Sequence, residues 1–280
     1  MKKIKVGLIS LGCEKNLVDS EMILGVCKEA GFEIETDLNL VDIIIINTCG
    51  FITSAKEEAI NTIFEALDYQ ENGTKIVVTG CLAQRYLEDL KKEIPEVDLY
   101  IPIKDYPIMG KLLSQLLNDN KYDGLCMNAN NRVLSTPPHL AYLKISEGCN
   151  NNCAYCAIPL IRGKFVSKKE EDIILEFKYL VNTGRKEICL ISQDLTKYGI
   201  DLENTAFNNE IKVQAELAID EADVIVFNTC SIRDGVDQKI MGNIGATKKL
   251  KKNKPSLVIA VCGCMTQANG ASDIVSQKFP

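Results

Sequence analysis

Three apolar runs near the N-terminus, each followed by a segment with helical periodicity, most constrain how this chain can fold. The runs Lys5–Ser10, Val41–Asn47 and Lys75–Thr79 have the length and composition of buried strands. Strands that alternate with helices are typical of a parallel sheet covered on both faces. The sequence therefore predicts an α/β fold whose N-terminal domain, residues 1–118, is a doubly wound parallel sheet. The predicted helices are Asn16–Ala30, Ser54–Glu71 and Ala83–Glu93, the last of which is stopped by Pro95.

A cysteine follows each of these strands within a few residues. Cys13, Cys49 and Cys81 are far apart in sequence, but the carboxyl ends of parallel strands lie along one edge of a sheet. Thiolate is a soft ligand that iron and zinc prefer. We infer a three-thiolate metal-cluster site at this edge. The alternative is that each cysteine is simply a small buried residue.

A second group of thiols lies in the short stretch Cys149–Cys156, directly after the predicted strand Ala141–Ser146. Cys149, Cys153 and Cys156 have the spacing CxxxCxxC. A four-iron cubane normally takes four cysteines, so a cubane held by these three would keep one iron open to a small molecule. Zinc sites are usually built from paired CxxC units or Cys/His pairs, and no second pair follows. Zinc and inert buried cysteines remain the alternatives.

Composition limits the class of protein. The chain has 280 residues with 12 cysteines and a formal net charge of -6. An acidic chain is not expected to bind nucleic acid through charge alone. No apolar run is long enough to cross a bilayer, and no signal peptide is apparent after Met1. We therefore expect a cytoplasmic protein without a membrane partner, in which many cysteines indicate metal.

Residues 119–138 are polar and irregular and are predicted to be a linker. Beyond the CxxxCxxC stretch, Arg162 offers planar donors that suit a carboxylate, although a solvated loop charge is the simpler interpretation. A helix at Glu170–Asn182 and a strand at Lys186–Ser192 come next, and Gln193 and Asp194 follow that strand. The remaining cysteines of this part, Cys27, Cys126 and Cys189, and the only histidine, His139, are interpreted as structural.

These motifs resemble the methylthiotransferase family of radical S-adenosylmethionine enzymes over residues 1 to about 203. The resemblance is strongest to the branch that modifies an aspartate of a ribosomal protein. It is carried by Ser10–Asn16, Asn47–Phe51, Gly80–Arg85, Ile145–Cys149, Ile158–Ser167 and Ser192–Asp194.

The resemblance implies a truncated radical S-adenosylmethionine (β/α) partial barrel over residues 139–205. It implies two [4Fe-4S] clusters and S-adenosyl-L-methionine as cofactors, with Cys149, Cys153 and Cys156 on one cluster. The implied substrate is an aspartate β-carbon of the twelfth small-subunit ribosomal protein, and the implied reductant is a protein such as flavodoxin or ferredoxin. The second cluster, which delivers sulfur, would be held by Cys13, Cys49 and Cys81, and the cofactor-binding residues would be Tyr155, Arg162, Gln193 and Asp194.

Residues 210–280 are predicted to form a second, partial α/β module that repeats part of the first domain. Ala222–Cys230 parallels Val41–Cys49, and Ser256–Cys264 parallels Lys75–Cys81. The repeat resembles the methylthiotransferases that modify tRNA adenosine. No counterpart of Cys13 precedes it, so the role of Cys230, Cys262 and Cys264 is open.

Only about two barrel units follow residue 140, and the substrate-binding β-barrel of the family has no counterpart in this sequence. A hybrid or truncated protein is therefore our hypothesis for this chain. Two alternatives to the ribosomal-protein enzyme stay open. One is a tRNA-adenosine methylthiotransferase, and the other is a non-catalytic iron–sulfur-binding fragment.

Overall fold

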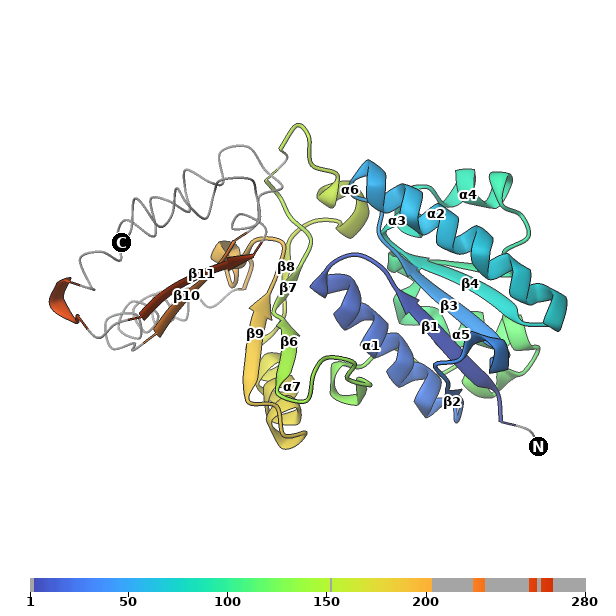
Figure 1. The fold of residues 1–280 in the computed structure, drawn as a ribbon, viewed down its shortest axis with the longest axis horizontal. Coiled ribbons are helices and arrows are strands. Elements are labelled where there is room, and N and C mark those ends of the chain that lie inside the picture. Colours follow the sequence, from blue (N-terminus) through green and yellow to red (C-terminus); the bar gives the residue numbers. More distant parts are fainter. Residues whose placement is uncertain (1–2, 152, 203–223, 230–251, 256–257, 264–280) are drawn as a thin grey trace. The chain divides into compact units, whose positions relative to one another are not determined.

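A computed structural model describes residues 3–151, 153–202, 224–229, 252–255 and 258–263 (Figure 1). The chain divides into two compact units, residues 1–203 and residues 204–280. The first unit contains both predicted thiol sites.

The first unit is built around a five-stranded parallel sheet with the strand order β2-β1-β3-β4-β5. Adjacent strands run in the same direction, so their carboxyl ends share one edge. The predicted parallel α/β domain is confirmed. The strands are β1 (Lys5–Ser10), β2 (Glu33–Ile34), β3 (Ile43–Thr48), β4 (Lys75–Gly80) and β5 (Leu99–Pro102).

Helices cover both faces of this sheet because its central strands are apolar on both sides (Figure 1). In β3, Ile44 and Ile46 pack under α2 and α4, whereas Ile43 and Ile45 pack under α1 and α5. All four isoleucines are buried, which is the strongest reason for β3 to be central. The covering helices are α1 (Glu14–Glu29), α2 (Thr53–Leu67), α3 (Cys81–Arg85), α4 (Leu87–Glu93) and α5 (Met109–Leu117).

A smaller parallel pair follows, made of β6 (Leu140–Lys144) and β9 (Glu187–Ile191), with α7 (Glu170–Asn182) packed on it. This is one strand–helix–strand unit of the predicted partial barrel. Two short strands, β7 (Ser146–Glu147) and β8 (Val166–Ser167), form a separate antiparallel pair. The helix α6 (Ile158–Arg162) lies between them in the sequence.

Several elements differ from the prediction. The expected helix Ala83–Glu93 is broken at Tyr86, and the expected helix Ser54–Glu71 ends as α2 at Leu67 before a 3-10 segment, η2 (Asp68–Asn72). The expected strand Ala141–Ser146 is divided, because the chain leaves β6 after Lys144 to form β7. The sequence analysis did not identify β2, β5 or α5. By contrast, β1 and α7 begin and end at the predicted residues.

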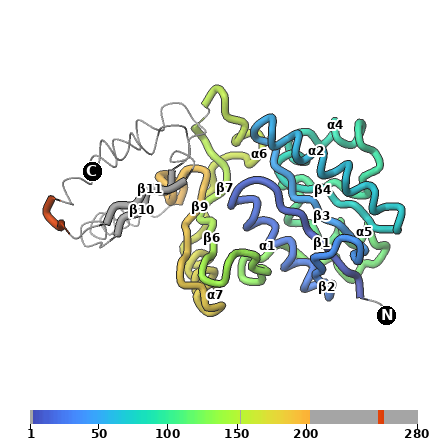
Figure 2. Tube along the Cα trace, in the orientation of Figure 1, coloured from blue at the N-terminus to red at the C-terminus, as the bar shows by residue number. Residues whose placement is uncertain are grey.

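Residues 119–138, predicted as a linker, make specific buried contacts. Tyr122 packs edge-on against Phe32. The 3-10 turn η5 (Ala129–Asn131) contacts α1 and α7. Figure 2 traces the chain through this segment. The Arg132 side chain is fully buried and pairs with Glu21 of α1 and Glu176 of α7. The segment is therefore an ordered connection inside the first unit. The predicted domain limits of 1–118, 119–138, 139–205 and 210–280 stay predictions.

In the second unit, the structure describes two parallel strands, β10 (Val224–Thr229) and β11 (Val258–Gly263). Thr229 pairs with Gly263, as Thr48 pairs with Gly80 in the first unit. The two strands of the predicted repeat thus pair in the same register as their counterparts. Cys230 and Cys264 lie outside the described residues.

The buried ion pairs of Arg132 give a stability prediction. We expect Arg132→Met to lower the free energy of unfolding of the chain by about 3–5 kcal/mol, because Glu21 and Glu176 would keep buried charges without this partner. The matched change Lys92→Met removes an exposed pair with Glu93 and should cost less than about 1 kcal/mol. Urea unfolding of the variants measures both values. Equal losses would show that the buried cluster contributes no more than a surface pair.

Candidate functional site

The carboxyl edge of the large sheet brings together the three cysteines that the sequence predicts. Cys13 is the N-cap of α1 after β1, Cys49 follows β3, and Cys81 begins α3 after β4. Gly12 has φ +94°, and a Cβ atom added there would lie 2.8 Å from Cys49 Cβ and 3.1 Å from Cys49 Sγ. The backbone between β1 and α1 therefore passes directly against Cys49. The convergence expected from parallel strands is present.

The three thiols also influence one another electrostatically. Burial raises the pKa of the Cys49 thiol, and the neighbouring Cys13 raises it further. Burial raises the pKa of Cys81 to about 11, although Arg162 acts in the opposite direction. Ionised thiols at this edge would repel one another, so a positively charged group among them is required to hold them as thiolates.

Two asparagines fix the chain around these thiols. Asn16 Nδ2 donates to the carbonyl oxygens of Leu11, at 3.0 Å, and Thr48, at 2.9 Å. Asn47 Nδ2 donates to Asn16 O at 2.8 Å and to Ser20 Oγ at 2.9 Å. These bonds tie the ends of β1 and β3 to the first turns of α1. The sequence analysis missed both residues, although the repetition of Asn-Thr-Cys at positions 47 and 228 was a usable signal.

The CxxxCxxC stretch starts at a tightly packed turn. Cys149 is buried, and its N–H donates to Gly163 O at 3.2 Å. Gly148 has φ +71°, and a Cβ added there would lie only 2.1 Å from Lys164 O. Further along, Cys156 N donates to Cys153 O at 2.9 Å, which closes a turn. Cys153 and Cys156 are half-buried. The start of the loop is thus fixed by the segment that follows α6.

Helix α6, which follows the CxxxCxxC stretch, packs against α3 at the edge of the large sheet. Cys81, Ala157 and Ile161 form one buried cluster, with Phe51 and Ile103 packed against it. Ala157 directly follows Cys156, so the residue after the CxxxCxxC stretch lies in the same buried cluster as a cysteine of the sheet edge.

Within the described part of the chain, no group of three or more His, Cys, Asp or Glu side chains is arranged around a single ion. Three thiols at a glycine-lined edge are a fitting donor set for iron.

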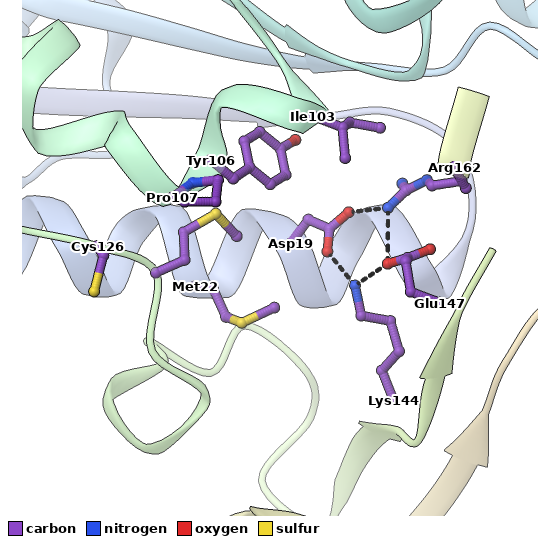
Figure 3. Close-up of a pocket in the computed structure, with 10 residues that line it drawn as sticks. Asp19, Met22, Ile103, Tyr106, Pro107, Cys126, Lys144, Glu147 and Arg162 are labelled. Atoms are coloured by element: carbon purple, nitrogen blue, oxygen red, sulfur yellow. Dashed lines mark hydrogen bonds and ion pairs between the residues drawn. The ribbon is translucent and has the colours of Figure 1, made fainter. Parts of the chain in front are cut away.

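Asp19, Lys144, Glu147 and Arg162 form a network of charged side chains, of which Asp19 and Arg162 are buried (Figure 3). Asp19 accepts from Arg162 NH1 and Lys144 Nζ, each at 2.6 Å, and Glu147 accepts from Lys144 Nζ at 2.7 Å. Burial opposes ionisation of Asp19, but the two cations outweigh it and lower its pKa. The network forms one wall of a cavity of about 370 Å³ whose remaining lining is mainly apolar.

The four predicted cofactor-binding residues occupy different environments. Tyr155 is 61% exposed. Gln193 Nε2 donates to Glu147 at 2.9 Å, while its buried Oε1 has no partner among the residues that the structure describes. Burial acts to raise the pKa of Asp194, but hydrogen bonds from Thr196 and Asn151 outweigh it and lower the pKa. Arg162 differs from the expected exposed donor, because it is buried and bonds to Asp19 and Asn16.

Comparison with known proteins adds to this geometry. The family model described as "Uncharacterized protein family UPF0004" matches residues 5–102 and 203–279. The chain belongs to the UPF0004 family. The two matched segments are the N-terminal sheet domain and the region in which the sequence predicts a partial repeat.

Among curated proteins, the UPF0004 chain is similar to several called "Ribosomal protein uS12 methylthiotransferase RimO". The protein from Clostridium kluyveri is 51% identical over 213 residues, which are 73% of this chain and 48% of that protein. The one from Caldicellulosiruptor saccharolyticus is 48% identical over 71% of this chain and 47% of its own length. The one from Clostridium tetani is 41% identical over 90% of this chain and 58% of its own length. The resemblance named from the motifs is confirmed.

This UPF0004 chain spans about half the length of the curated relatives that it matches. Among solved structures, it is similar to the cobalamin-dependent S-adenosylmethionine radical enzyme OxsB, with a TM-score of 0.51 and 13% identity over 94% of this chain and 49% of OxsB. This likeness supports the predicted α/β fold and no more than the fold. No described helix is both long and apolar enough to cross a bilayer.

The asparagine pair gives the prediction for this site. We expect Asn16→Ala to lower the free energy of unfolding by about 1–3 kcal/mol, because the Leu11 and Thr48 carbonyls would lose their donor. The exposed Asn39, which bonds only within its own turn, provides the control. Asn39→Ala should change the free energy by less than about 0.5 kcal/mol in the same urea titration. An unchanged value for Asn16→Ala would mean that the strand ends are held by other contacts.

Proposed function

We propose that this chain is a radical S-adenosylmethionine methylthiotransferase that places sulfur and a methyl group on an aspartate β-carbon of ribosomal protein uS12. The observation that carries the proposal is that Cys81 of the sheet edge and Ala157, the residue after the CxxxCxxC stretch, lie in one buried cluster. The similarity to uS12 methylthiotransferases at 41–51% identity supports the choice of substrate.

Each thiol group would hold one [4Fe-4S] cluster. Cys149, Cys153 and Cys156 would hold the cluster that binds S-adenosyl-L-methionine, and the other cluster would lie on Cys13, Cys49 and Cys81. When bound, these groups supply an electron for reductive cleavage of the sulfonium and a sulfur atom for transfer. The protein itself positions the thiols: the glycine turns before Cys13 and Cys149 bring the backbone close to its neighbours, and Asn16 and Asn47 fix the sheet edge.

The chain also offers groups for the S-adenosyl-L-methionine molecule. Gln193 Oε1, which has no partner among the described residues, is an acceptor that suits the ammonium group of an amino acid, and the next residue, Asp194, has a lowered pKa that keeps it ionised. The exposed ring of Tyr155 lies within the cysteine loop and could stack on the adenine. Arg162 is a less suitable ligand for the cofactor carboxylate, because two of its nitrogens already bond within the protein.

Anaerobic reconstitution provides the first test. We expect about eight irons per chain, since two cubanes carry four each, and formation of deoxyadenosine from S-adenosyl-L-methionine with dithionite or with flavodoxin as reductant. Replacement of Cys149, Cys153 and Cys156 by alanine should leave about four irons and abolish deoxyadenosine. Zinc in place of iron would contradict the proposal, and iron without cleavage would support a non-catalytic iron–sulfur fragment.

The substrate is tested separately by supplying uS12 and unmodified tRNA to the reconstituted protein. We expect methylthiolation of the uS12 aspartate, detected by mass spectrometry of its peptides, and none on tRNA. Modification of tRNA adenosine instead would support the alternative that the repeat in residues 210–280 suggests. Modification of neither, with cleavage of S-adenosyl-L-methionine intact, would contradict the proposed substrate.

A single glycine tests whether the sheet edge holds a cluster. We expect Gly12→Ala to remove about four of the eight irons, because the new methyl group would collide with Cys49. Gly73 is the matched control: it has a similar φ, +82° against +94°, but nothing lies within 4 Å of its added Cβ. Both variants should lose about 1–2 kcal/mol of stability from backbone strain. If Gly73→Ala lost as much iron as Gly12→Ala, the loss would reflect strain and not the position of Cys49.

A further inference from the structure

Arg162 comes from the segment that follows the CxxxCxxC stretch, and its side chain reaches a cysteine of the sheet edge. It is the last residue of α6, a five-residue helix that begins two residues after Cys156. From this position its guanidinium extends to the edge of the large sheet. There NH2 lies 3.4 Å from Cys81 Sγ and 2.5 Å from Asn16 Oδ1.

The remaining contacts fix the guanidinium in place. NH1 bonds to Asp19 Oδ2 at 2.6 Å and lies 3.4 Å from Glu147 Oε2 (Figure 3). The side chain is 2% exposed, and that of Asp19 is 1% exposed. Water therefore does not screen the charge, and the planar fork keeps one nitrogen directed at sulfur while the other is held by the carboxylate.

We propose that Arg162 is a positioning residue that sets the electronic state of the cluster on Cys13, Cys49 and Cys81, by donating a hydrogen bond to the Cys81 sulfur. This inference rests on the proposed function, because it requires Cys81 to be a cluster ligand. Hydrogen bonds and positive charge at ligand sulfurs favour the reduced cluster, which carries one more negative charge. Arg162 therefore makes this cluster easier to reduce.

The contact between Asp19 and Arg162 gives a second prediction, in which the reduction equilibrium of the cluster shifts in the opposite direction. The Asp19 carboxylate offsets the charge of Arg162 at NH1, whereas Cys81 lies by NH2. Asp19→Asn removes this negative charge but keeps the side-chain shape, so less of the positive charge of the Arg162 guanidinium is neutralised. Arg162→Gln and Asp19→Asn should thus move the reduction equilibrium of the cluster in opposite directions. A purely structural role for the pair would give no such opposition.

The test uses the full chain in which Cys149, Cys153 and Cys156 are alanine, so that only the sheet-edge cluster is present. Its midpoint potential is measured by a redox titration followed by electron paramagnetic resonance. We expect Arg162→Gln to lower the equilibrium constant of one-electron reduction about tenfold, which is about 59 mV. Arg162→Lys, which keeps the charge, should recover part of this shift, and Asp19→Asn should raise the constant.

Arg85 supplies the matched control. It is a half-buried arginine four residues after Cys81, and its NH1 contacts Gly50 O at 3.5 Å. Arg85→Gln also removes one positive charge near the edge of the large sheet. It should shift the equilibrium constant of one-electron reduction less than threefold. Equal shifts for Arg162→Gln and Arg85→Gln would overturn the inference, as would shifts of the same sign for Arg162→Gln and Asp19→Asn.

Iron content separates this inference from the proposed function. A folded alanine-substituted background that binds no iron contradicts both. A background that holds about four irons with a potential unaffected by Arg162 contradicts only the inference. If Arg162→Gln itself fails to bind iron, the midpoint potentials of Arg162→Lys and Asp19→Asn test the inference. Potentials equal to that of the alanine-substituted background in both variants would overturn the role of Arg162.

Discussion

The parallel alignment of β1, β3 and β4 is the constraint on which the rest of the structure depends. Because the three strands run the same way and pair without offset, with Ser10 opposite Asn47 and Asn47 opposite Thr79, the residues after them emerge at one edge. The apolar faces of β3 hold this register, since a slip of one residue would exchange the two buried surfaces. The site is therefore a consequence of hydrophobic packing some distance from it.

Helix α1 connects this edge to the second half of the unit. Its buried polar residues Asn16, Asp19 and Glu21 each accept from an arginine that lies more than a hundred residues later. Buried charges of this kind add little net stability, but each is costly to leave unpaired. They therefore specify one arrangement of α1 against the elements that follow. That arrangement is what brings Cys81 to α6.

The sequence predicts the sheet and its thiols well because both follow from local patterns. Four consecutive isoleucines indicate a buried strand, and a cysteine after each of three parallel strands indicates a shared edge. The repeated Asn-Thr-Cys singles out Asn47, but the partners of Asn16, Asn47 and Arg132 were not predictable in this way, since folding alone brings them close. Arg162 shows the same limit. Its residue type indicated an anion, but its sequence position did not identify Asp19 as that anion.

The second unit shows which feature of the first unit its repeated sequence reproduces, namely the pairing of two parallel strands. β10 and β11 repeat the register of β3 and β4, with Asn228 opposite Cys262 where Asn47 is opposite Thr79. The strand pairing is therefore encoded in the repeated segments themselves. In the first unit, however, Asn47 acts by bonding to Asn16 and Ser20 of α1, and these follow the Cys13 turn. The repeat has no cysteine that corresponds to Cys13. It therefore repeats the strand pairing of the first unit but not all three cysteines of the predicted site.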